Sequence, residues 1–117
     1  MESHRNLTDE AFVAAFAACS LPEALFNHEA HLRLAWIHIR NQGLEQATAT
    51  VCTQITNYVK HLGAEDIYNE PLTVAAVHIV HQFQEQATEL DFLPFMERFP
   101  QLKTNFRELI NAYLSES

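Results

Sequence analysis

Glycine and proline are scarce in this chain, and their scarcity argues against a turn-rich fold. The 117 residues include 2 glycines and 4 prolines, while 48% of the residues are hydrophobic. A β-rich domain of this size needs many tight turns, which depend on these two residues. No stretch alternates between polar and apolar residues as a half-buried strand does. We therefore expect an all-α protein with one hydrophobic core.

Basic residues are also few. The chain has 7 Lys and Arg residues against 15 Asp and Glu residues, which gives a net charge of −8 at pH 7. A nucleic-acid backbone would be repelled by this charge, and no basic stripe offsets it. The composition therefore predicts that nucleic acid is not a partner.

Long apolar runs and paired cysteines are absent as well. No run approaches the roughly 18 apolar residues of a membrane span, and the opening MESHRNLTDE lacks the apolar region of a signal peptide. Cys19 and Cys52 are isolated in apolar helical surroundings, where they form neither a disulfide framework nor a zinc knuckle. We expect a cytoplasmic protein with buried, reduced cysteines and no membrane partner.

Capping residues and breakers divide the chain into helices. The predicted helices run from Thr8 to a stop before Pro22, from Asn27 to Gly43, from residue 44 to Gly63, from Asn69 to about Ala87, from Asp91 to Pro100, and through residues 101–114. Short connections favour a compact antiparallel bundle of five to six helices. The whole chain, 1–117, is expected to be one domain, with residues 1–7 as a flexible N-terminal tail.

The segment FNHEAHLRLAWIHIR raises the question of a site. His28 and His31 are three residues apart, so they share one helix face, with Cβ atoms about 5–6 Å apart. In an antiparallel bundle the second and fourth helices run parallel, which places Asn69 and Glu70 at the same end. Two imidazoles and the Glu70 carboxylate would suit a divalent metal, zinc or iron(II). The alternative is that the histidines face solvent or are hydrogen-bonded.

Other polar and aromatic residues allow two interpretations each. His38, His78 and His81 could form a second cluster or be neutral core histidines. Arg33 could hold an anionic substrate or the Glu70 carboxylate, or it could be an ordinary surface residue. The aromatic residues at helical spacing are expected in the core: Trp36, Phe92, Phe95, Phe99 and Phe106.

Two of these blocks resemble a known signature. FNHEAHLRLAW resembles the F-x-H-x-x-H-x-R-x-A-W block of a family of small, uncharacterised bacterial all-helical proteins, and YNEPLT is similar to its Y-H-E-T-x-T block. The closing residues DFLPFMERFPQLKTNFRELINAYLS also look like that family's last helices. The resemblance implies a helical fold and a site at Phe26, His28, His31, Arg33, Trp36, Tyr68, Glu70 and Thr73. Asn69 and Pro71 depart from the pattern, which has His and Thr there.

Two hypotheses about function follow from these residues. In the first, His28, His31 and Glu70 bind a divalent metal, with Asn69 as a fourth ligand, and Arg33 or Tyr68 orients a small anionic substrate. A metal-free variant uses a histidine for acid–base chemistry, oriented by Glu70. In the second, the protein is a non-catalytic helical module, a homodimer with structural histidines. The decisive feature is whether the His28 and His31 rings and the Glu70 carboxylate converge on one pocket.

Overall fold

The computed structural model describes residues 3–116, and this part of the chain is helical without any strand. The elements are a 3₁₀ turn at His4–Asn6, α1 (Asp9–Ala17), a 3₁₀ turn at Glu23–Leu25, α2 (His28–Gln42), α3 (Leu44–His61), a 3₁₀ turn at Glu65–Ile67, α4 (Glu70–Gln84), α5 (Phe92–Arg98), α6 (Gln101–Thr104) and α7 (Phe106–Glu116). The predicted all-α class is confirmed. Within residues 3–116, no helix is both long enough and apolar enough to cross a membrane.

The helix starts follow the predicted caps. The side chain of Asn27 accepts a hydrogen bond from the Ala30 amide at 2.9 Å, and Asn69 accepts one from the Leu72 amide at 3.1 Å. These bonds satisfy amides that the first helical turn leaves free. Gly43 joins α2 directly to α3 with φ of 84° and ψ of 168°, a backbone conformation that residues other than glycine rarely adopt.

The number of helices differs from the prediction because the last predicted helix is divided. Asn105 has φ of −136° and ψ of 25°, which ends α6 after one turn and lets α7 begin in a new direction. Asparagine competes with helical hydrogen bonds through its own side chain, so it suits such a break. The described residues therefore form seven α-helices instead of five to six.

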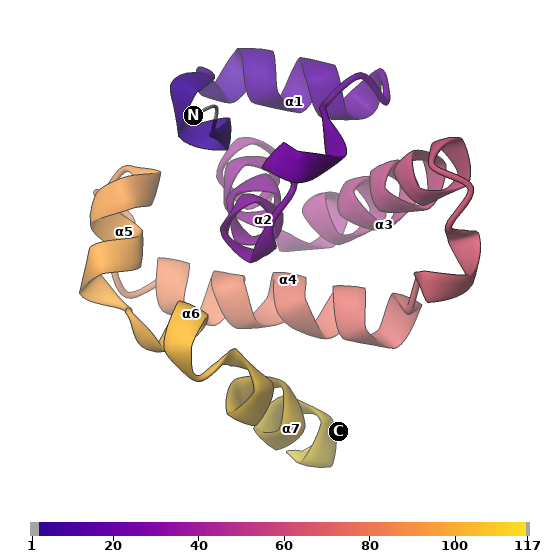
Figure 1. The fold of residues 1–117 in the computed structure, drawn as a ribbon. Coiled ribbons are helices and arrows are strands. Elements are labelled where there is room, and N and C mark those ends of the chain that lie inside the picture. The colour runs from indigo at the N-terminus through magenta and orange to yellow at the C-terminus, as the bar shows by residue number, and fades with distance from the viewer. Residues whose placement is uncertain (1–2, 117) are drawn as a thin grey trace.

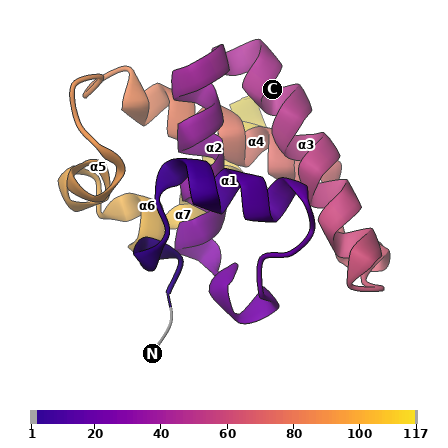
Figure 2. The same cartoon turned by 90° about the horizontal axis from the view of Figure 1, so that it is seen from above.

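Helix α2 is the centre of the molecule and packs against α3 and α4 (Figure 1). Its middle is buried on every side, with Leu32, Leu34, Ala35, Trp36 and Ile37 in the core, as expected for a helix enclosed by others. In Figure 1, α2 is seen almost along its axis while α4 lies across the view, so the two helices cross. The antiparallel bundle with parallel α2 and α4 is therefore not confirmed. Seen from above, α1 covers α2 (Figure 2).

Most of the predicted aromatic core is confirmed. Trp36, Phe92, Phe95 and Phe99 are buried. Phe106 is half-buried, and it lies at the start of α7. Because α7 packs on α4, Phe106 borders a cleft between the two instead of the centre of the core.

The N-terminal segment, expected to be a flexible tail, packs against α2 from His4 onward. His4 is only 1% exposed. Its Nδ1 lies 3.2 Å from a nitrogen of Arg33, which can only donate, so Nδ1 accepts. The proton of neutral His4 is therefore on Nε2, which donates to Glu29 Oε1 at 2.8 Å. Burial also lowers the pKa of His4, against the pull of Glu29.

Glu29 joins three parts of the chain. Its carboxylate, 6% exposed, accepts two hydrogen bonds from Arg5 at 2.7 Å and one from Lys103 at 3.2 Å, besides that of His4. The Arg5 hydrogen bonds, with help from Lys103 and His4, lower the pKa of Glu29 to about 2 despite its burial. This carboxylate therefore ties the N-terminal turn and α6 to the first turn of α2.

Candidate functional site

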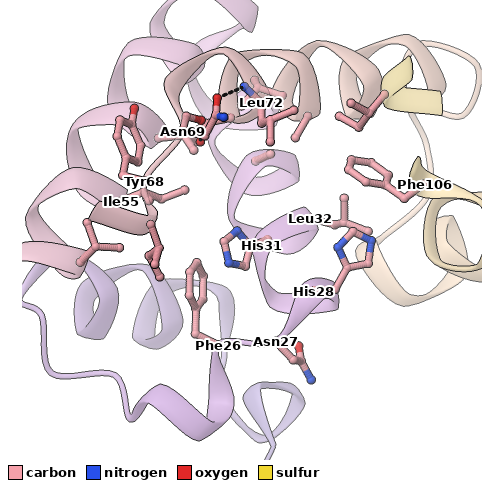
Figure 3. A pocket seen from close by; sticks show the side chains of 18 of the residues that line it. Phe26, Asn27, His28, His31, Leu32, Ile55, Tyr68, Asn69, Leu72 and Phe106 are labelled. Carbon is pink, nitrogen blue, oxygen red and sulfur yellow. Dashed lines mark hydrogen bonds between the residues drawn. The ribbon is translucent and has the colours of Figure 1, made fainter. Parts of the chain in front are cut away.

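A cleft of about 1150 Å³ opens between α2, α3, α4 and α7 (Figure 3). Its apolar lining consists of Phe26, Leu32, Ala35, Val51, Ile55, Val59, Leu62, Ala64, Ile67, Leu72, Ala76, Val77, Val80, Phe106 and Ile110. Small-molecule sites in proteins are typically concave and mostly apolar, with a few polar groups that orient the ligand. The volume is large for a chain of 117 residues, and it would hold a molecule of drug size.

His31 is the polar group at the centre of this cleft. Its ring stacks on Phe26, with ring centres 3.9 Å apart, and points into the space between Phe26, Ile55 and Leu72 (Figure 3). The side chain is exposed at the open side of the cleft, while Phe26 and the apolar lining of the cleft cover the rest of the ring. This burial, and secondarily the charge of His28, lowers the pKa of His31 to about 4. His31 is therefore neutral at pH 7, with one ring N–H to donate and one ring nitrogen to accept.

Neither ring nitrogen of His31 has a hydrogen-bond partner among residues 3–116. The side chain is exposed at the open side of the cleft, so water can occupy these positions until another molecule replaces it. The ring faces the open interior of the cleft, so a molecule in the cleft can supply the partner.

His28 has a different environment, although it is on the same helix face. Its Nε2 donates to the Leu102 carbonyl oxygen at 3.0 Å, and its ring packs edge-on against Phe106 with ring centres 4.8 Å apart. His28 thus connects the start of α2 to α6 and α7. It lines the cleft on that side, while His31 reaches the middle.

The three groups of the predicted metal site do not converge. Glu70 is exposed and does not line the cleft; its nearest polar partner is the Tyr68 hydroxyl at 3.5 Å. Asn69 does line the cleft, but its side-chain oxygen caps α4 (Figure 3). In residues 3–116, no group of three or more His, Cys, Asp and Glu side chains could hold a metal ion. The acid–base variant also lacks its basis, because Glu70 does not contact either histidine.

Arg33 lies outside the cleft, contrary to the expectation that it orients a substrate there. All five of its N–H groups already have acceptors, which are Asp9, Leu7 O, His4 O and His4 Nδ1. Its guanidinium also lies over the Phe12 ring, 4.8 Å from the ring centre. Arg33 borders a separate small cavity of about 320 Å³, but it has no free donor for a ligand. Its role is to hold the N-terminal segment on α2.

Tyr68 and Thr73 line the cleft, as the second sequence block implied. Removal from water raises the pKa of Tyr68 to about 12, so its hydroxyl keeps its proton at neutral pH. Thr73 donates its hydroxyl hydrogen to the Asn69 carbonyl at 3.1 Å. Both hydroxyls therefore have partners within the chain, Glu70 for Tyr68 and the Asn69 carbonyl for Thr73.

The second histidine cluster is not formed. His38 is buried within reach of the Gln42 and Gln54 side chains at 2.9 and 3.3 Å, and burial lowers its pKa. On α4, His78 packs on Tyr113 and His81 lies 3.7 Å from Glu85. Each of the three histidines thus has its own neighbours.

The sequence reasoning missed the side of the cleft formed by α6 and α7. Lys103, Thr104, Phe106, Arg107 and Asn111 all line it. The available signal was the amphipathic spacing of Phe106, Ile110 and Tyr113 in the last helix. That signal predicts an apolar face, but it does not reveal which helix the face packs against.

The chain matches no protein-family model, no curated protein and no solved structure. The resemblance to the family of small bacterial helical proteins therefore stays a prediction. Any proposal about function depends on the geometry of the cleft.

Proposed function

We propose that this protein binds a small, mainly apolar molecule in the cleft between α2, α3, α4 and α7. The observation that carries the proposal is the neutral His31 ring, which stands in an apolar cleft without a hydrogen-bond partner in the described chain. An apolar cleft favours an apolar ligand because binding removes apolar surface from water. The unpaired ring nitrogens favour a ligand that carries at least one polar atom.

The stacking of His31 on Phe26 supports binding because it fixes the ring before a ligand arrives. The two rings are nearly parallel, with an interplanar angle of 26°, and Phe26 also packs on Phe16 and Tyr58. A polar group held in advance loses little freedom when it binds a ligand. His31 can therefore select for a polar atom in the ligand.

The test uses a neutral, apolar fluorescent dye, N-phenyl-1-naphthylamine, titrated into the purified protein. The wild type should bind one dye per chain. Ala76 lines the cleft and Ala112 is exposed outside it, so Ala76→Phe fills the cleft while Ala112→Phe is its matched control. We expect Ala76→Phe to weaken dye binding by about fivefold or more, since it blocks apolar contact area, and Ala112→Phe to leave it unchanged. Equal binding by all three proteins, or no saturable binding, would refute the proposal.

A second candidate function is the homodimer module. It is favoured by three exposed apolar side chains that line the cleft: Ile67 is 72% exposed, Leu72 43% and Leu62 38%. Apolar side chains gathered on one surface often mark a protein–protein contact. Molar mass measured by light scattering at rising concentration separates the two. The ligand-binding proposal expects a monomer that binds the dye, and the module expects a dimer whose formation competes with the dye.

A further inference from the structure

The charged residues around the cleft are unevenly distributed. Among the described residues, two of the chain's 7 Lys and Arg residues line the cleft, Lys103 and Arg107, against one of its 15 Asp and Glu residues, Glu23. A protein with a net charge of −8 thus has a cleft whose fixed charges sum to about +1. An anion is therefore repelled less strongly at the cleft than at the rest of the molecule.

The positive charge is confined to one side. Lys103 lies on α6 and Arg107 lies on α7. His28 contacts the same side through the Leu102 carbonyl of α6. The facing helices α3 and α4, both within the described chain, line the cleft without any charged side chain. Glu23 acts on the α3 side, where burial and its charge raise the pKa of Tyr58. One end of the cleft is thus cationic and the other is apolar.

Arg107 is the cation that remains available. Lys103 is held 3.2 Å from the Glu29 carboxylate, which it shares with Arg5. Arg107 has no ion pair among residues 3–116. On α7, the residues three and four positions after Arg107 are Ile110 and Asn111, so no acid on its own helix is in position to pair with it. A guanidinium without a partner at the edge of an apolar cleft is suited to a carboxylate, which it can bind through two parallel hydrogen bonds.

We infer that the ligand is an apolar monocarboxylate whose carboxylate binds Arg107 and whose apolar body lies against α3 and α4. This inference rests on the proposed function, and it adds the chemical class and the orientation of the ligand. A single negative charge matches the one guanidinium that lines the cleft within residues 3–116. A phosphate dianion would add an uncompensated charge to a protein that is already strongly acidic.

Calorimetric titration with decanoate and with decanol tests the inference, since the two probes share an apolar chain and differ in charge. The wild type should bind decanoate about three- to fivefold more tightly than decanol, the range of a partly exposed ion pair. Arg107→Gln should remove this preference by weakening decanoate alone. The matched control is Arg98→Gln on α5, because Arg98 is also exposed but does not line the cleft, and it should retain the preference.

Three results would overturn the inference. The first is equal affinity of the wild type for decanoate and decanol, and the second is the same loss of preference in both arginine variants. The third is tighter binding of decyl phosphate than of decanoate, which would assign the site to phosphate. If N-phenyl-1-naphthylamine still binds in the cleft in any of these cases, the proposed function stands and only the carboxylate assignment fails. If the dye does not bind either, both fail.

Discussion

Two histidines on one helix face have opposite roles in this protein. His28 donates its ring hydrogen to the Leu102 carbonyl and holds α6 in place, whereas His31 presents its ring to the cleft. Spacing along a helix determines which side chains share a face, but it does not determine what each ring packs against. The neighbours of each ring, Phe106 for His28 and Phe26 for His31, come from other parts of the chain.

Acidification should expose the effect of His31 on stability. Its pKa falls from the ordinary value of 6.5 to about 4 in the folded protein, so between these values the unfolded chain binds more protons than the folded one. The contribution of neutral His31 to the free energy of unfolding is then fully present above about pH 6.5 and is lost as the pH falls toward 4. The His31→Gln variant lacks this titrating group. We therefore expect the free energy of unfolding of the variant to fall less than that of the wild type over this pH range.

Urea unfolding of both proteins from neutral pH to about pH 4.5 measures the difference. Burial also lowers the pKa of His4 and His38, but both residues are present in wild type and variant, so their effects cancel in the comparison. Parallel stability curves for the two proteins would contradict the lowered pKa of His31.

At the scale of elements, the Glu29 carboxylate is the point where the N-terminal turn, α2 and α6 meet. Arg5 and His4 contact it from the N-terminal turn, and Lys103 contacts it from α6. α6 leads directly into α7, which forms one side of the cleft. A buried carboxylate in the first turn of α2 therefore helps to position the helix that carries Arg107.

Glu29→Gln keeps the shape of this side chain and removes its charge. Because the amide has one accepting oxygen and one NH2 group where the carboxylate offers two charged acceptors to His4, Arg5 and Lys103, we expect a loss of about 2–3 kcal/mol in the free energy of unfolding. Chemical denaturation at neutral pH measures it. The matched control, Glu89→Gln, alters an exposed residue between α4 and α5 and should change stability by less than about 0.5 kcal/mol. Equal effects of the two substitutions would show that the contacts of Glu29 contribute little.

Helix positions were predictable from the sequence where the signal is local. Asn27, Gly43, Gly63 and Asn69 mark helix ends by their own backbone and side-chain chemistry, and the structure uses all four at or next to such ends. The break at Asn105 was missed because asparagine occurs both within and between helices.

The candidate site was less predictable because it depends on packing between distant elements. His31, Tyr68 and Thr73 do line one cleft, as the sequence blocks implied. Glu70 was expected there because the second block includes it and because α2 and α4 were taken to be parallel, but Figure 1 shows the two helices crossing. The roles of Arg33 and Glu29 depend on His4 and Arg5, some 24 to 29 residues away in sequence, in a segment that composition alone describes as a polar tail.

On the scale of the whole molecule, the protein consists of an enclosed helix, α2, with a polar clamp on one side and an apolar cleft on the other. The clamp consists of the buried Glu29 and Arg33 and their ion-pair partners Arg5 and Asp9. The cleft leaves a polar ring and an arginine without partners in the described chain. This asymmetry is the basis of our proposals that the clamp contributes to folding and that the cleft binds a ligand.

The most direct test of this account is histidine-selective NMR of the wild-type protein during titration with N-phenyl-1-naphthylamine. The ring signal of His31, identified by its loss in His31→Gln, should shift saturably with one dye per chain. His61 and His81 do not line the cleft and serve as internal references whose signals should stay in place. A His31 signal that does not move while the dye binds, or equal shifts of all three signals, would contradict the claim that the cleft holds a ligand against His31.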